Sequence, residues 1–435
     1  MEKHDDLVAD NLGGYKTGGW NAHFILIVCS LLYMINYMDR QVLSIVLQPM
    51  KEDLNLTDAY AGALQTIFML GILVFSAPSA YLIDRWSRRK MLGLMAIVWS
   101  LATFATGFGN DFWGVAIPRA IVGVGEAGFA AAGIAMITAT YSQNYRGRVM
   151  GIFNMFIVFG IALGSILAGY ISVLYNSWRT PFYVFAIPGI ILGVMAFFLR
   201  DYKTVQVEKA LDGGKGFIAC VICLFKIPTL RWLYIGIAMF QVIQAAALGW
   251  LPAFIMRAQN INADKAGMIL GILFLTSFIG IPLGGYLADF WQKRNDRGRM
   301  YVAALSVLCT VVFLAIALVL DYKGTGLIFG FLFGFSAGMG IAALASITQD
   351  VVPPELKGLS WGMAVFCQYA LGAWAPSIVG LMSDGLGGGA YGLRVALIST
   401  TVVSGVLSCF CYLIGAKYYT ADQDKVKGCA LEYEK

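Results

Sequence analysis

Two stretches of the chain read almost alike: A-Y-L-I-D-R-W-S-R-R-K from Ala80 to Lys90, and G-Y-L-A-D-F-W-Q-K-R from Gly285 to Arg294. In each, a long apolar run ends near an aspartate, which is Asp84 in the first stretch and Asp289, 205 positions later, in the second. Basic residues follow both aspartates within a few positions. A recurrence at this distance indicates that the two halves of the 435-residue chain are copies of one duplicated unit.

A second set of matches extends the duplication, at an offset of 211 positions. The matched pairs are Arg146-Gly147 with Lys357-Gly358, Gly151 with Gly362, and Gly169 with Gly380. Internal repeats of apolar segments are typical of transporters that bind their substrate near the membrane midplane, between the repeats.

The composition indicates a membrane protein. Apolar residues make up 59% of the chain and charged residues 13%, whereas a soluble protein has about 45–50% and about 25%. One helical span needs about 20 apolar residues. Twelve apolar runs, too long for barrel strands, lie at about 22–48, 59–83, 91–109, 112–140, 149–174, 181–199, 231–256, 266–288, 300–320, 325–351, 359–383 and 393–415.

We therefore expect an all-α membrane protein with twelve transmembrane helices in two pseudo-symmetric six-helix bundles. The expected parts are an N-terminal tail at 1–21, a first bundle at 22–199, a partly amphipathic linker at 200–230, a second bundle at 231–416 and a C-terminal tail at 417–435. When Arg231 and Arg394, at the start of their spans, are counted with the adjoining connections, 23 of the 31 Lys and Arg residues lie in the tails and even-numbered connections, and 6 lie in the odd-numbered ones. The positive-inside rule then places both termini in the cytoplasm.

Four ionisable residues lie well inside predicted spans: Asp39 and Arg40 in the first, and Arg119 and Glu126 in the fourth. Each such charge costs at least about 2.5–3.5 kcal/mol to insert, so these residues are expected to face a cavity and to have partners. Arg119 and Glu126 are two helical turns apart on one face, and Asp39 and Arg40 point about 100° apart. Pairs of Asp39 with Arg119, or of Arg40 with Glu126, are consistent with this spacing.

Glu126 is the preferred candidate for a proton carrier because small apolar residues surround it in G-V-G-E-A-G. Burial favours the protonated carboxyl and a nearby guanidinium favours the carboxylate, so movement of the arginine would load or unload a proton. The alternative is a permanent ion pair that pins the two helices together.

Several polar and aromatic residues inside the spans are candidates for a cavity wall, with interhelical hydrogen bonding or an interfacial position as the alternative for each. These candidates are Asn36, Tyr37, Gln241, Gln244, Gln368 and Trp374, with Trp250 and Tyr369 beside them. Because the second half contributes polar groups but no charge, an amphipathic substrate would suit such a cavity.

Enzyme motifs in the chain lack their partners. The G-x-S-x-G around Ser336 has no histidine base within reach, since the two histidines are His4 and His23. Cys220 and Cys223 have the spacing of half a zinc site, without a second ligand pair nearby. We expect no enzyme, no metal and no nucleic-acid partner.

The sequence resembles the major facilitator superfamily over all twelve spans, and within it the Spinster family of lipid transporters. The superfamily resemblance rests on the two loops quoted above, with Asp84, Arg85, Arg88, Arg89 and Lys90 in one and Asp289 and Lys293 in the other. The Spinster resemblance rests on I-N-Y-M-D-R at 35–40, R-A-I-V-G-V-G-E-A at 119–127 and Y-L-I-D-R-W-S-R-R-K.

This resemblance implies a proton-linked carrier of lysolipids, sphingosine-1-phosphate or similar single-chain lipids, which works by rocker-switch alternating access. Asp39 and Glu126 then look like the protonatable groups, Arg119 like the tuning partner and Arg40 like a cavity charge. The residues of a conformational latch would be Asp84, Arg85, Arg88, Arg89, Asp289 and Lys293. The resemblance further implies a monomer with protons as the coupling ion and no cofactor. The compact loops suggest a bacterial member of the family, and hence the bacterial inner membrane.

Two other functions stay open. Symporters of sugar acids and other organic anions in the same superfamily also carry N-Y-x-D-R and G-x-x-E-A, usually with prolines soon after the glutamate, whereas Glu126 here precedes A-G-F-A-A-A-G-I-A-M. A membrane sensor that binds without transporting is the second alternative, although a sensor would be expected to carry a larger soluble segment.

Overall fold

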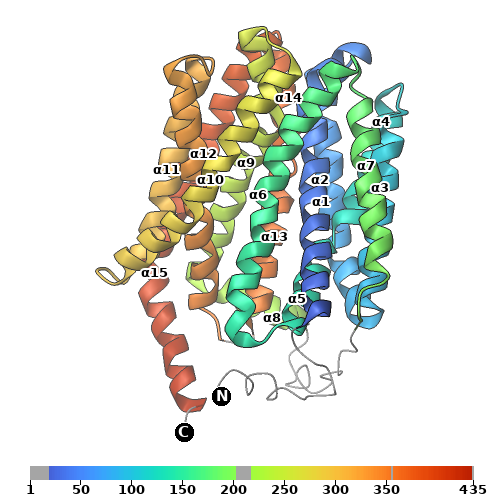
Figure 1. The fold of residues 1–435 in the computed structure, drawn as a ribbon. Coiled ribbons are helices and arrows are strands. Elements are labelled where there is room, and N and C mark those ends of the chain that lie inside the picture. The colour runs from blue at the N-terminus through green and yellow to red at the C-terminus, as the bar shows by residue number, and fades with distance from the viewer. Residues whose placement is uncertain (1–18, 202–216, 354–355, 434–435) are drawn as a thin grey trace, which may run out of the picture. The chain divides into compact units, whose positions relative to one another are not determined.

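The computed structural model describes residues 19–201, 217–353 and 356–433, and within these ranges the regular secondary structure is entirely helical. Because a backbone in lipid must satisfy its own hydrogen bonds, long apolar runs fold as helices. The helices, shown in Figure 1, are α1 Trp20–Asp53, α2 Asp58–Arg85, α3 Arg88–Thr106, α4 Phe112–Glu126, α5 Phe129–Thr140, α6 Gln143–Leu174, α7 Thr180–Ala196, α8 Phe217–Lys226, α9 Pro228–Gln259, α10 Ala263–Gln292, α11 Gly298–Val319, α12 Thr325–Asp350, α13 Lys357–Gly372, α14 Ala375–Gly385 and α15 Gly389–Tyr433.

The predicted spans coincide with these helices, and the all-α membrane fold is confirmed. Ten helical stretches of the described residues are long and apolar enough to cross a membrane, and α7 is a shorter apolar helix. The predicted span at 91–109 corresponds to α3. Two spans are interrupted: 112–140 is divided into α4 and α5, and 359–383 into α13 and α14.

Helix ends follow local capping chemistry. α4 begins after Asp111, whose side chain accepts a hydrogen bond of 2.6 Å from the Gly114 N–H. α9 ends at Asn260, which adopts the left-handed conformation with φ 54°. The first turn of α9 receives its cap from another helix, because the Asp422 carboxylate of α15 accepts hydrogen bonds from the Thr229 N–H and hydroxyl. Part of the predicted C-terminal tail is therefore helical and docked.

The chain forms two compact units, in each of which the helices run side by side (Figure 1). Unit 1 consists of Met1–Leu56, Ile67–Val205 and Asn262–Gly271, and unit 2 of Thr57–Thr66, Gln206–Ile261 and Ile272–Lys435. Each unit thus includes the start of one helix from the other half of the sequence: α2 in unit 2, and α10 in unit 1.

The predicted linker contains helix α8, where the sequence favours an amphipathic segment. The rest of the predicted linker between 202 and 216 and the predicted N-terminal tail up to residue 18 lie outside the described residues.

Candidate functional site

Unit 1 gathers the four charges predicted to be buried. α1 carries Asp39 and Arg40, and α4 carries Arg119 and ends at Glu126, where the span breaks before α5. Asp39 and Arg119 have no exposed surface, Glu126 is 3% exposed, and the Arg40 side chain retains 18%. Two acids and two bases therefore share the interior of one unit, which limits the cost of burying them.

An ion pair joins the two helices. Arg40 Nε donates a hydrogen bond of 2.7 Å to Glu126 Oε2. This is one of the two cross-helix pairs that the residue spacing allowed. Asn36, one turn before Arg40 on α1, is buried, and neither its Nδ2 nor its Oδ1 makes a hydrogen bond with the described residues. Glu126 is thus held by Arg40 of α1 while its own backbone ends α4.

Asp39 of α1 contacts α3. Its Oδ2 accepts a hydrogen bond of 3.4 Å from the Thr103 hydroxyl of α3, and its Oδ1 makes none with the described residues. The charge of Arg119 attracts Asp39, whereas that of Glu126 repels it. The two carboxylates therefore sense each other, and a change of protonation at one alters the energy of the charge on the other.

The charge of Arg119 is stabilised by an aromatic ring and by two nearby acids. Its Nε and Nη1 make no hydrogen bond to any described residue, although it attracts both acids electrostatically. The guanidinium carbon instead lies 4.8 Å from the centre of the Phe68 ring, and that of Arg40 lies 5.7 Å from the same ring. Arg40 also stacks on Tyr37, at 4.6 Å. Phe68 of α2 thus contacts both cations through its negatively polarised face.

Close packing of α2 on α4 fixes the position of Phe68. A methyl group at Gly123 would lie 2.3 Å from the Phe68 carbonyl oxygen, and one at Gly71 would lie 2.8 Å from that of Ala120. Because both positions are glycine, the two backbones approach closely and the Phe68 ring is brought against Arg119. Phe68 gave no signal in the sequence, since an aromatic residue inside an apolar run looks like ordinary core.

Replacing Phe68 by leucine should slow transport by about tenfold, because a cation–π contact of a desolvated cation contributes on the order of 2 kcal/mol and two cations share this ring. Phe68→Tyr keeps the aromatic face and should retain most of the rate. Initial uptake rates at saturating substrate in proteoliposomes would measure both variants. Equal losses in the two variants would contradict the role of the ring.

The predicted cavity residues divide between the units. Asn36 is buried and Tyr37 is partly buried in unit 1, while Gln241, Gln244 and Gln368 are partly buried in unit 2. Trp374, at the junction of α13 and α14, is 50% exposed. Their contact with substrate stays a prediction.

The predicted latch residues are described only in part. Asp84 and Arg85 have side chains outside the described part of the structure. Arg88 is buried, Arg89 donates a hydrogen bond of 3.3 Å to the Leu199 carbonyl, and Lys293 is exposed.

Asp289 pairs with Arg299, a residue without a signal in the sequence. Arg299 at the start of α11 contacts Asp289 at 2.6 Å and Asp350 of α12 at 2.5 Å. The Tyr419 hydroxyl donates a hydrogen bond to the same Asp350 carboxylate. One arginine thus joins α10, α11 and α12 within unit 2, and the latch role of Asp289 stays a prediction.

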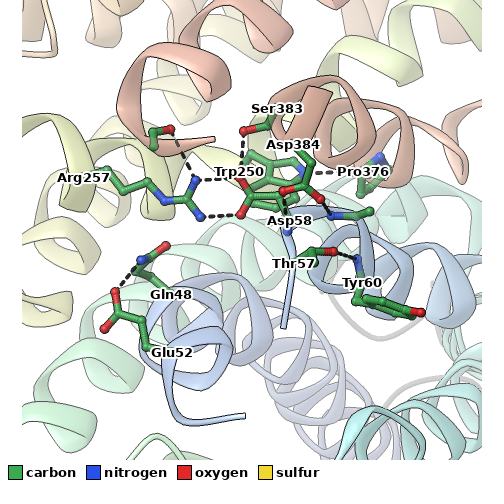
Figure 2. Close-up of polar contacts among 12 residues, drawn as sticks. Gln48, Glu52, Thr57, Asp58, Tyr60, Trp250, Arg257, Pro376, Ser383 and Asp384 are labelled. Carbon is green, nitrogen blue, oxygen red and sulfur yellow. Dashed lines mark hydrogen bonds and ion pairs between the residues drawn. The ribbon is translucent and has the colours of Figure 1, made fainter. Parts of the chain in front are cut away.

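A second polar cluster, unforeseen in the sequence, lies in unit 2 around Asp58 (Figure 2). Asp58 is fully buried and forms an ion pair with Arg257 of α9. Among the described residues, no group of three His, Cys, Asp or Glu side chains is arranged to hold a metal ion.

Comparison with known proteins gives a consistent family. The model of the Major Facilitator Superfamily matches residues 29–376. Spinster homolog 1 of Xenopus tropicalis is 25% identical over 393 residues, which cover 85% of this chain and 74% of that protein. The sphingosine-1-phosphate transporter SPNS2 of the same organism is 26% identical over 379 residues, covering 82% of this chain and 73% of that one. The resemblance to Spinster proteins is thereby confirmed.

Solved structures show the same fold. A bacterial homolog of the human lysosomal transporter Spinster, in an inward-facing and unoccupied conformation, superposes with a TM-score of 0.81 at 20% identity and covers 93% of this chain and 99% of that one. A D-xylose–proton symporter reaches a TM-score of 0.69 at 14% identity, over 89% of this chain and 97% of that one.

Proposed function

Because the chain belongs to the Major Facilitator Superfamily, and is thus a multi-pass membrane transporter rather than an enzyme, we propose that it couples protons to the movement of lysolipids or sphingosine-1-phosphate-like lipids by rocker-switch alternating access. The observation that carries this proposal is the partly buried contact of 2.7 Å between Arg40 and Glu126. The proposal places the chain as a monomer in a bacterial inner membrane with both termini in the cytoplasm, and requires no cofactor besides the coupling proton.

The coupling step is a change of partner by Arg40. Ionised Glu126 holds the Arg40 guanidinium, and protonation of Glu126 removes the negative charge that holds it. A cation that binds substrate must be accessible. The Arg40 side chain is 18% exposed, whereas Arg119 is fully buried, so Arg40 is the better candidate. A released guanidinium would pair with an anionic lipid headgroup, so that proton and substrate favour the same state.

One proton is too small a drive for the whole conformational change. Moving an equilibrium from 1:99 to 99:1 takes about 5.5 kcal/mol, which exceeds what neutralising a single partly hydrated pair supplies. Asp39, whose charge is coupled to that of Glu126, and the bound substrate supply the remainder in this scheme.

The choice of a lipid rests on two observations. The four charges predicted inside spans all lie in unit 1, and the uncharged polar candidates Gln241, Gln244 and Gln368 lie in unit 2, a division that suits a substrate with one charged end. In addition, a relative at 26% identity is named a sphingosine-1-phosphate transporter.

Transport by purified protein in proteoliposomes tests the proposal. Labelled lysophospholipid, sphingosine-1-phosphate and a sugar acid would be offered with and without a pH gradient, and albumin extraction would remove lipid left in the outer leaflet. We expect gradient-dependent entry of at least one lipid and none of the sugar acid. Entry of the sugar acid alone would establish the organic-anion symporter instead, and binding without counterflow would establish a sensor.

A further inference from the structure

The first turns of α2 are anchored in unit 2 by a buried ion pair (Figure 2). Arg257 Nη1 and Nη2 donate hydrogen bonds of 2.8 and 2.6 Å to the two carboxylate oxygens of Asp58. The Ser383 hydroxyl donates a third, of 2.7 Å, to Asp58 Oδ2. Asp58 is fully buried and the Arg257 side chain is 9% exposed, so the pair is bidentate and largely dry.

A second carboxylate caps the same helix start. Asp384 of α14 accepts hydrogen bonds of 3.0 and 2.8 Å from the backbone N–H groups of Asp58 and Ala59. These N–H groups belong to the first turn of α2, where no intrahelical partner exists and the helix dipole favours a negative charge. The cap of α2 is thus supplied by a residue 325 positions away in the sequence.

Glycines allow the backbones of α2 and α14 to approach each other closely next to these charged residues. A methyl group at Gly62 would lie 2.3 Å from the Pro376 carbonyl oxygen, and one at Gly380 would lie 2.2 Å from that of Asp58. Any side chain at either position would push α2 and α14 apart.

The duplicated half repeats this packing without the charges. At the same offset of 205, Gly62 corresponds to Gly267 of α10, whose added methyl group would lie 2.3 Å from the Ser165 carbonyl of α6. Gly169, the counterpart of Gly380, approaches the Ala263 carbonyl equally closely. This helix start lies in unit 1, as that of α2 lies in unit 2. The start of α2 in unit 2 and the start of α10 in unit 1 therefore make equivalent contacts in the two repeats.

The chemistry of the two copies differs at the decisive positions. Ala263 replaces Asp58, and Val173 replaces Asp384 at the offset of 211. The nearest acid, Asp264, has a buried Oδ1 that makes no hydrogen bond with the described residues. Among the described residues, the α10 copy thus has the glycine packing with neither an ion pair nor a carboxylate cap at these two positions, whereas the α2 copy has all three.

From this asymmetry we infer that Asp58, Arg257 and Asp384 form a lock on the first turns of α2, which opens and closes once in each transport cycle, whereas the α10 copy moves on uncharged contacts. The inference rests on the proposed alternating access, because α2 continues from unit 2 into unit 1 and must leave one of them when they move apart. When Asp58 and Arg257 separate, water hydrates both charges. This hydration offsets the loss of the ion pair, so the open lock is a second stable arrangement.

Thiol accessibility tests the lock without substrate or a pH gradient. Ala61, on the same turns of α2, is fully buried. In a full-length variant whose eight cysteines are replaced, Ala61→Cys would be reacted with a membrane-impermeant maleimide in nanodiscs, open to both membrane faces. We expect Asp58→Asn, and independently Asp384→Asn, to accelerate the labelling by at least about tenfold, because each removes charge-assisted bonds that hold the closed state.

Two controls separate the lock from general loosening. Asp321→Asn breaks another Arg–Asp pair of unit 2, with Arg394, and should leave the labelling rate at Ala61→Cys within about twofold. Asp264→Asn alters the α10 copy and should also leave it unchanged. Acceleration by these controls as large as that by Asp58→Asn, or none by either lock variant in a monodisperse protein, would overturn the inference. Since lipid uptake is not measured, a failure of the proposed substrate would leave this result intact.

Discussion

Glu126→Gln is expected to abolish accumulation of substrate driven by a pH gradient, lowering gradient-driven uptake by at least about tenfold while exchange of substrate down its own gradient persists. The amide keeps the size of the carboxyl group but can neither take up nor release a proton. It also cannot form the ion pair of 2.7 Å with Arg40, so the guanidinium is released in every state. Transport then continues without coupling. The measurement is a ratio: the rate of uptake under an imposed pH gradient, divided by the rate of counterflow without a gradient. This ratio reports proton coupling independently of the transport rate.

The controls for Glu126 use other acids of unit 1. Asp53→Asn removes a half-exposed acid paired with Arg179 and should leave the ratio unchanged. Asp39→Asn should lower the ratio less than Glu126→Gln, because Asp39 is coupled to Glu126 but receives no hydrogen bond from Arg40. An unchanged ratio in Glu126→Gln would remove Glu126 from the coupling, and its loss in Asp39→Asn alone would assign the proton to Asp39.

The sequence predicted the helices because the membrane imposes a strong rule: long apolar runs become helices, and basic loops separate them. It did not predict the break between Glu126 and Phe129, since the run from 112 to 140 is apolar apart from Arg119 and Glu126 and long enough to form one helix. There, Gly125 and Gly128 pack closely against Trp99 and Met95 of α3. Such a break depends on a neighbouring helix, which no local pattern reports.

The charged cluster could be predicted from the sequence because the same apolar runs that predict the helices make a charge inside them conspicuous. Asp39, Arg40, Arg119 and Glu126 stand out within apolar runs, and the pair Arg40–Glu126 was one of two that helical geometry allowed. Asp58 and Arg257 were missed because they lie at helix ends, where charges are ordinarily hydrated. Their pairing spans 199 residues, and it is buried where the start of α2 packs within unit 2.

Arg257→Met should destabilise the protein by about 3–5 kcal/mol, because it leaves the Asp58 carboxylate buried without its cation. The Ser383 hydroxyl, which donates a neutral hydrogen bond to Asp58, cannot replace the lost cation. Arg257→Lys preserves the charge but not the two parallel N–H donors, so an intermediate loss is expected. Reversible unfolding of the purified protein in mixed micelles, followed by circular dichroism, would measure the free energy of unfolding.

The matched control is Arg179→Met. Arg179 pairs with Asp53 at 2.8 Å, close to the 2.6 Å of Arg257 with Asp58, but its side chain is 28% exposed and that of Asp53 is 49% exposed. Water therefore screens this pair, and its loss should cost no more than about 1 kcal/mol. Equal losses in the two variants would show that burial adds nothing to the Asp58–Arg257 pair.

Adding Asp58→Asn to Arg257→Met should recover part of the lost stability, because the charge left unpaired is then removed. This recovery distinguishes an unpaired charge from lost packing: if the arginine mattered only through the contacts of its aliphatic stem, the double variant would be no more stable than Arg257→Met. The same double variant should nevertheless label rapidly at Ala61→Cys, since the bidentate bonds are absent. If the double variant regains stability but still labels rapidly, the Asp58–Arg257 pair contributes more to holding the closed conformation than to the free energy of unfolding.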